Sequence, residues 1–132
     1  MDKPSVIQFE SIGDTTLGYI SVCEEIKNIP FEMQRVYWTY FTPQSITRGG
    51  HANINKELVL VAVSGIITVT TELRDGTKDT FLLDHPSKGL YIPRLCWHTM
   101  QYSHNAVQMV IASNLYSEED YIRDYQSFKS WK

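Results

Sequence analysis

Short runs of β-branched and aromatic residues recur along the sequence, and turn residues separate them at regular intervals. This spacing is typical of a β-sandwich or a β-barrel. Four of the five prolines fall between the runs, where they remove no hydrogen bond from a strand. The sequence therefore predicts an all-β fold, with strands over residues 6–9, 17–23, 35–41, 57–63, 66–73, 78–83, 89–92, 97–102 and 107–112.

Two turn signals support this order of strands. The segment 74–77 contains Asp75-Gly76, a pair that tolerates the positive φ angles of a tight turn. Ser64-Gly65 is a second signal of the same kind. We expect a hairpin at residues 74–77, between the strands 66–73 and 78–83.

The pattern changes after Asn114. Apolar or aromatic residues stand at positions 121, 122, 125 and 128, which is helical spacing. Ser117 with Asp120 resembles a capping box, and the acidic first turn suits the positive end of a helix dipole. The sequence therefore predicts one C-terminal α-helix that begins near residue 117 and packs its aromatic stripe on the sandwich as part of the core.

Size, charge and cysteine usage restrict the class of protein. A chain of 132 residues predicts one domain over residues 1–132. Its 12 basic residues are outnumbered by 15 acidic ones, which gives no electrostatic support for binding nucleic acid or anionic lipid. No apolar run resembles a membrane span or a signal-peptide core, and Cys23 and Cys96 lack the spacing of a zinc site. We expect a cytoplasmic protein with buried thiols and no membrane or nucleic-acid partner.

The densest group of polar residues is Arg48-Gly49-Gly50-His51-Ala52-Asn53, followed by Glu57. Positions 51, 53 and 57 differ by even numbers, so one continuous strand would point all three side chains to the same face. A second histidine, His98, follows a proline turn at the start of a later strand. We expect these residues to converge inside the barrel, where histidine suits proton transfer because its pKa lies near neutrality.

A metal site would need about three or four imidazole or carboxylate ligands. The first motif supplies His51 and Glu57, whereas Asn53 is a poor ligand. His85 and His104 stand in turn-like segments, where we expect surface residues. The sequence therefore predicts no metal, and a metal-dependent enzyme is the least favoured alternative.

The combination of a histidine strand and a later strand with one more histidine resembles the two motifs of a cupin. Six stretches, in order, narrow the resemblance to the WxcM-like cupin family of nucleotide-sugar 3,4-ketoisomerases. They cover nearly the whole chain and lie at residues 27–31, 35–37, 48–52, 89–92, 97–100 and 120–125. The resemblance implies a cupin-type jelly-roll sandwich that acts as a homodimer.

The resemblance also implies an activity. Such an enzyme converts dTDP-4-keto-6-deoxyglucose into a dTDP-3-keto-6-deoxyhexose, without a cofactor, for the synthesis of a 3-amino sugar of a surface polysaccharide. It implies His51 as the principal acid/base, with Tyr37 or His98 in the second proton-transfer or enediolate-stabilising role. Arg35 and Arg48 are the expected diphosphate ligands, because guanidinium makes paired hydrogen bonds to phosphate oxygens.

The family's catalytic stretch reads Arg-Gly-aromatic-His-Ala-His, and this chain departs from it at Gly50 and Asn53. Asparagine can orient a substrate hydroxyl but cannot carry a proton at neutral pH. We therefore assign Asn53 to substrate binding. The second alternative follows from this departure, and it is a nucleotide-sugar-binding module that kept the cupin cavity and lost catalysis.

Overall fold

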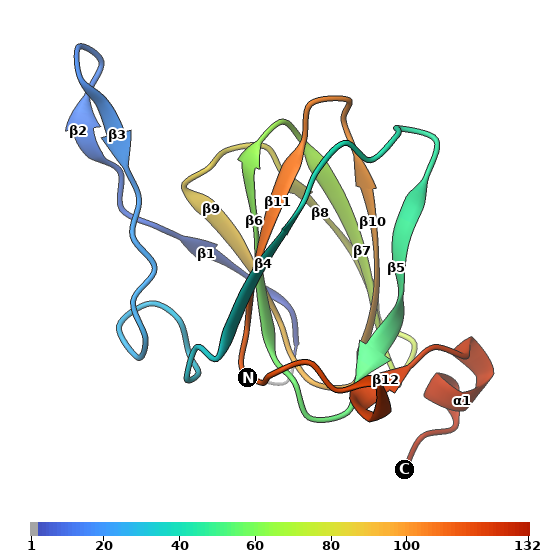
Figure 1. The fold of residues 1–132 in the computed structure, drawn as a ribbon. Coiled ribbons are helices and arrows are strands. Elements are labelled where there is room, and N and C mark those ends of the chain that lie inside the picture. Colours follow the sequence, from blue (N-terminus) through green and yellow to red (C-terminus); the bar gives the residue numbers. More distant parts are fainter. Residues whose placement is uncertain (1–2) are drawn as a thin grey trace.

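The computed structural model describes residues 3–132. Two five-stranded antiparallel sheets face each other across a core, and a small hairpin projects from one side (Figure 1). The first sheet has the order β1 (Ser5–Gln8), β9 (Lys88–Ile92), β6 (Leu58–Ser64), β11 (Val107–Ala112), β4 (Arg35–Thr39). The second has the order β12 (Tyr121–Ile122), β5 (Thr47–Asn53), β10 (Cys96–Tyr102), β7 (Ile67–Leu73), β8 (Lys78–Leu83). The predicted all-β sandwich of cupin type is confirmed.

The central strand β6 fixes the packing of the first sheet. Its sequence is apolar at nearly every position, because both of its faces are buried. Leu58, Leu60 and Ala62 contribute to the core between the sheets. Val59 and Val61 point the other way and pack with Phe9, Ile29 and Phe31 of the N-terminal segment. That segment therefore covers the outer face of the first sheet.

Both predicted turns are confirmed. Gly76 lies in the turn between β7 and β8 with φ of 93°, and Gly65 lies between β6 and β7 with φ of 72°. A Cβ atom at Gly65 would stand 2.6 Å from Cα of Ala106, so a larger residue would collide with the neighbouring turn. Glycine is needed there for space as well as for conformation.

The C-terminal segment differs from the prediction. Glu118–Asp120 form one 3₁₀ turn, β12 follows, and the helix α1 covers only Tyr125–Lys129. Its N-cap is Asp124, whose side chain accepts a hydrogen bond of 2.9 Å from the Ser127 amide. The predicted capping box at Ser117 is wrong, because β12 pairs with β5 and its backbone groups join the sheet. A C-terminal helix exists, but it begins eight residues later than predicted.

Two further differences concern the N-terminal half. Only Gly18–Ile20 (β3) of the predicted strand 17–23 is extended and paired, and its partner is the unpredicted β2 (Ile12–Asp14). These two strands form the projecting hairpin of Figure 1. Cys96 is buried, Cys23 is half-buried, and both thiols are free. From residue 3 onward, no helix is long and apolar enough to cross a membrane.

Candidate active site

Polar side chains gather where an edge of one sheet approaches an edge of the other. Strand β4 ends the first sheet and β12 ends the second. On β4, Arg35 and Tyr37 are half-buried while Val36 and Trp38 are exposed, so the first pair faces inward. We call the inward-facing group the histidine cluster, and it comprises Arg35, Tyr37, His51, Lys56, His98 and Tyr121.

The two predicted histidines come together. His51 on β5 stands opposite His98 on β10, and their ring centroids are 4.7 Å apart in an edge-to-face arrangement. The Nδ1 atom of His98 lies 3.0 Å from the Cys96 carbonyl oxygen. Because a carbonyl only accepts, Nδ1 must carry the hydrogen, and Nε2 is left as the acceptor of the neutral ring.

Two glycines aim His51 into the cluster. Gly49 and Gly50 have φ angles of 86° and 74°, and the register between β5 and β10 shifts beside them. A Cβ atom at Gly49 would lie 2.7 Å from the carbonyl oxygen of His98. Beyond this irregularity the strand alternates regularly, with Ala52 packed outward against Ile122 and Phe128 of the C-terminal segment. His51 and Asn53 therefore face the interior.

Burial keeps both imidazoles neutral. It lowers the pKa of His51 to about 3, and the adjacent His98 and the charges of Arg123 and Lys56 act in the same direction. Burial also lowers the pKa of His98. Nδ1 of His51 is buried and makes no hydrogen bond of good geometry to the described residues. At neutral pH, His51 is therefore uncharged and free to accept a proton, although the same shift makes it a weaker base than an imidazole in water.

Tyr37 lies at the β4 side of the cluster. The pKa of its phenol is raised to about 12, mainly by burial and also by the nearby Tyr121, while the charges of Arg35 and Arg48 act in the opposite direction. The guanidinium of Arg35 stacks over the Tyr37 ring at 4.4 Å. Arg48 is exposed at the start of β5, yet its charge reaches Tyr37. Tyr37 is therefore a protonated hydrogen-bond donor at neutral pH.

Asn53 provides a buried amide on the same face as His51. Its side chain is 2% exposed, and Nδ2 finds no hydrogen-bond partner within residues 3–132. A buried amide without a partner is costly, so such a group marks a place where an acceptor from a ligand would fit. This position suits the assignment of Asn53 to substrate binding, which stays a prediction.

Two members of the cluster were missed by the sequence analysis. Lys56 is 1% exposed, and its ammonium group donates a hydrogen bond of 2.9 Å to the Tyr121 hydroxyl. The Tyr121 ring packs edge-on against His51 at 4.9 Å. The helical spacing predicts that Tyr121, Ile122 and Phe128 all belong to the core, and only Ile122 and Phe128 are buried there. Only the pairing of β12 with β5 reveals where the Tyr121 side chain points.

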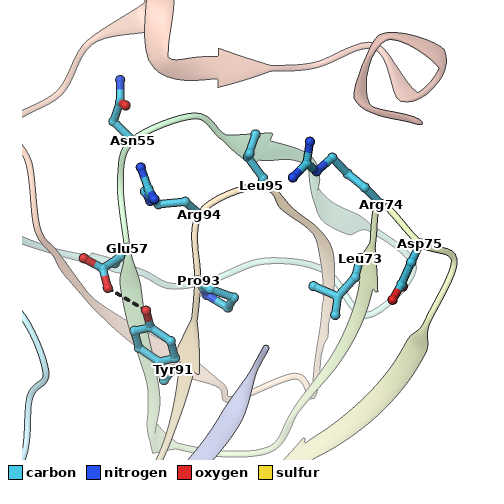
Figure 2. Close-up of a pocket in the computed structure, with 9 residues that line it drawn as sticks. All are labelled: Asn55, Glu57, Leu73, Arg74, Asp75, Tyr91, Pro93, Arg94 and Leu95. Atoms are coloured by element: carbon cyan, nitrogen blue, oxygen red, sulfur yellow. Dashed lines mark hydrogen bonds between the residues drawn. The ribbon is translucent and has the colours of Figure 1, made fainter. Parts of the chain in front are cut away.

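The expected convergence of Glu57 with His51 is wrong. Strand β5 ends at Asn53 and β6 begins at Leu58, so the even spacing does not carry across the intervening turn. Glu57 instead accepts a hydrogen bond of 2.5 Å from the Tyr91 hydroxyl at the end of the barrel. Figure 2 shows this pair and Arg94 among the residues that line one cavity. The cavity has a volume of about 790 Å³, and its lining includes no histidine and, apart from Glu57, none of the predicted site residues.

The other two histidines lie outside the cluster, and the cluster does not resemble a metal site. His85 and His104 are exposed, as predicted. Within residues 3–132, no three His, Cys, Asp or Glu side chains converge as metal ligands. The histidine cluster offers two imidazoles together with phenols and cations, which is a set suited to moving protons rather than to holding a divalent ion. Metal independence stays a prediction.

Known proteins resemble the chain over almost its full length. A TDP-4-oxo-6-deoxy-alpha-D-glucose-3,4-oxoisomerase from Aneurinibacillus thermoaerophilus is 42% identical over 128 residues, which cover 96% of this chain and 90% of that protein. A sugar 3,4-ketoisomerase from Thermoanaerobacterium thermosaccharolyticum, solved in complex with TDP, is 33% identical with a TM-score of 0.91, over 96% of this chain and 92% of the other.

A variant of the same Thermoanaerobacterium enzyme with one histidine replaced by asparagine has been solved in complex with TDP-4-keto-6-deoxyglucose. It is 32% identical to this chain with a TM-score of 0.91, and the match covers 98% of this chain and 93% of the other. The model of the FdtA family, described as WxcM-like, C-terminal, matches residues 2–132. On this match and the 42% identity, the chain belongs to the FdtA (WxcM-like, C-terminal) family.

Proposed function

We propose that this chain is a nucleotide-sugar 3,4-ketoisomerase that converts dTDP-4-keto-6-deoxy-D-glucose into a dTDP-3-keto-6-deoxyhexose. The observation that carries the proposal is the contact of His51 with His98 inside a chain 42% identical to an oxoisomerase of this substrate class. The whole chain, residues 1–132, acts as one domain. An aminotransferase would then use the 3-keto product to make a 3-amino sugar for a surface polysaccharide.

The reaction needs a base for the C3 proton and groups that stabilise charge on the sugar oxygens. His51 is the proposed base, because burial keeps its ring neutral. Tyr37 keeps its phenolic hydrogen and can donate it in a hydrogen bond to the C4 oxygen. Nε2 of the neutral His98 ring carries no hydrogen, so it can accept a hydrogen bond from a sugar hydroxyl. Enolisation next to a ketone needs neither a metal nor a nicotinamide.

Three further residues are proposed to hold the substrate. Arg48, exposed at the start of β5, is proposed to bind the diphosphate, because guanidinium makes paired hydrogen bonds to phosphate oxygens. Arg35 lies deeper and is proposed to reach a phosphate or sugar oxygen with Nη1, which is buried and has no hydrogen-bond partner in the described chain. Asn53 orients a sugar hydroxyl through its amide. We also propose a cytoplasmic location, because both cysteines are free as in a reducing compartment.

Incubation with dTDP-4-keto-6-deoxyglucose in deuterated water, followed by NMR, tests the activity. We expect loss of the C3 proton signal and appearance of a 3-keto sugar, both unchanged by a chelator. Binding without exchange would contradict the enzyme and support the binding module that Asn53 suggests. Activity that disappears with the chelator would support a metal-dependent cupin.

We further propose that the protein is a homodimer. Exposed apolar side chains concentrate on the projecting hairpin and on the edge strand β4, which is unusual for a monomer's surface. Leu17 is 87% exposed on the hairpin, and Trp38 is 62% exposed on β4. An unpaired sheet edge beside such side chains is a natural place for a second copy of the chain.

A further inference from the structure

Strand β12 brings a phenol to the histidine cluster from the C-terminal end of the chain. Tyr121 stands opposite Asn53 in the pairing of β12 with β5. Its ring meets His51 edge-on, with centroids 4.9 Å apart. Asp120, next to Tyr121, holds this segment in place by accepting a hydrogen bond of 2.7 Å from the Asn55 amide. The phenol is therefore fixed beside the proposed base.

Lys56 is buried in a way that packing alone does not explain. The side chain is 1% exposed, and none of the carboxylates in residues 3–132 forms an ion pair with it. Taking an ammonium group out of water without a counter-charge is expensive. Its hydrogen-bond partner is the Tyr121 hydroxyl. Because the ammonium donates, the phenol oxygen accepts and its own hydrogen remains available.

The surroundings of Tyr121 make its phenol more acidic. Burial by itself raises the pKa of Tyr121, but hydrogen bonds from Lys56 and Arg35, and their charges, lower it below its ordinary value of 10.0. The guanidinium of Arg123 also stacks over the ring at 4.4 Å. Tyr37 shows the opposite shift, since burial dominates there. Of the two phenols, Tyr121 is the better proton donor.

We infer that Tyr121 is a catalytic residue that delivers the second proton of the isomerisation, to C4, and that Lys56 is its positioning residue. This inference rests on the proposed function. It also accounts for Asn53, since a titratable phenol stands directly across the strand pair from an amide that cannot carry a proton.

The proton transfers balance with these groups and water. His51 takes the proton from C3, the C–H electrons form the C3–C4 double bond, and O4 becomes an enolate oxygen. The O3 proton then passes to O4, the ketone forms at C3, and C4 takes the phenolic proton of Tyr121. The His51 imidazolium then loses its proton to water, and the Tyr121 phenolate regains a proton from water. Both residues end in their starting states.

The test separates the two proton transfers. Tyr121→Phe is assayed by NMR on dTDP-4-keto-6-deoxyglucose in deuterated water, beside Tyr125→Phe as a matched control. Tyr125 donates to Glu72 near α1, outside the cluster. We expect Tyr121→Phe to keep C3 exchange within about threefold and to lose at least about 100-fold of the isomerisation rate, as for a positioned acid. The control should keep both rates.

Lys56→Met tests the positioning role through the pH profile. Without the ammonium group, the pKa of Tyr121 rises, so the alkaline limb of kcat should move to higher pH while kcat falls and C3 exchange persists. The ionisable groups that surround the phenol are Arg35 and Tyr37 from β4, His51 from β5, and Tyr116, Glu118 and Arg123 from the C-terminal segment. They are unchanged in this variant, so the shift reports Lys56.

A measurement without turnover keeps the inference testable if Lys56→Met does not fold. Ultraviolet titration of the eight tyrosines should lose its most acidic phenol in Tyr121→Phe and not in Tyr125→Phe. If Tyr121→Phe isomerises the substrate at the wild-type rate, the inference is wrong. It is also wrong if folded Tyr121→Phe binds dTDP but loses both C3 exchange and isomerisation. Either result leaves the proposed function standing. A wild-type protein without C3 exchange would overturn the proposed function and this inference with it.

Discussion

At the scale of single residues, His51 is the group on which the proposed chemistry depends most. His51→Ala removes the base at C3, so both exchange and isomerisation should fall by at least about 100-fold. The affinity for dTDP, measured by calorimetry, should stay within a few-fold because other residues hold the nucleotide. The control is His85→Ala, which removes an exposed histidine bonded to Ser87. Full activity in His51→Ala would move the base to His98 or Tyr37.

Asn53 offers a rescue experiment. In a Tyr121→Phe background, Asn53→His places an imidazole across the strand pair from the lost phenol. We expect this double variant to isomerise at least about tenfold faster than Tyr121→Phe alone, which is within the range of a positioned acid or base. Rates are measured by NMR on the same 4-keto sugar. Equal rates in the two variants would show that position 53 cannot replace the phenol.

The buried imidazole also makes stability depend on pH. The pKa of His51 is 6.5 in an unfolded chain and about 3 in the folded protein. Between these two values of pH, the unfolded state therefore binds a proton at His51 and the folded state does not. The free energy of unfolding should therefore fall as pH falls below about 6.5. Urea unfolding at about pH 7.5 and pH 5 measures this, with His51→Gln expected to show a smaller loss. Carboxylates contribute little in that window, because the ordinary pKa values of Asp and Glu, about 3.9 and 4.3, lie below pH 5.

At the scale of elements, the two glycines of β5 give a matched pair of variants. Gly49→Ala forces a Cβ atom to 2.7 Å from the His98 carbonyl oxygen at a φ of 86°. Gly50→Ala has a φ of 74° but nothing within 4 Å of its Cβ atom. Gly50→Ala should cost about 1–2 kcal/mol from backbone strain alone, and Gly49→Ala should cost clearly more. Urea unfolding compares them, and equal losses would mean that the contact with His98 relaxes freely.

The strands show what local pattern can and cannot predict. The hairpin at residues 74–77 and the strands Lys78–Leu83 and Val107–Ala112 were predicted within their bounds, because turn chemistry and alternation act locally. The prediction of one helix from residue 117 was wrong, because positions 121, 122, 125 and 128 satisfy helical spacing although residues 121 and 122 form a strand. The partner of β12 lies almost 70 positions earlier, at Ala52 and Asn53. No local rule contains that pairing.

The candidate site divides in the same way. His51 and His98 could be predicted to meet, since each lies in a motif that places it on a strand facing the interior. The position of Glu57 could not be predicted, because side chains alternate between faces only within a strand and β5 ends at Asn53. Lys56 and Tyr121 carried no signal as single residues. Their role depends on the contact between them, which long-range strand pairing creates.

At the scale of the whole molecule, the exposed apolar surface predicts the oligomeric state. Light scattering at micromolar concentration should give twice the chain mass of 15.3 kDa. Trp38→Glu introduces a charge on the exposed face of β4 and should shift the population toward the monomer. Trp131→Glu, at a residue 37% exposed near the C-terminus, is the control. A wild-type mass equal to one chain would contradict the dimer.

The line along which β4 faces β12 has a consequence for the passage of substrate. Among the described strands, β4 bonds only to β11 and β12 only to β5, so no backbone ladder joins the two sheets along this line. Across this line, the guanidinium of Arg35 on β4 lies 5.2 Å from the ring centroid of Tyr116, which precedes β12. A change of rotamer at Arg35 or Tyr116 would open this line without breaking a strand, so we expect a bulky sugar nucleotide to enter and leave here while the framework that holds His51 and His98 stays intact.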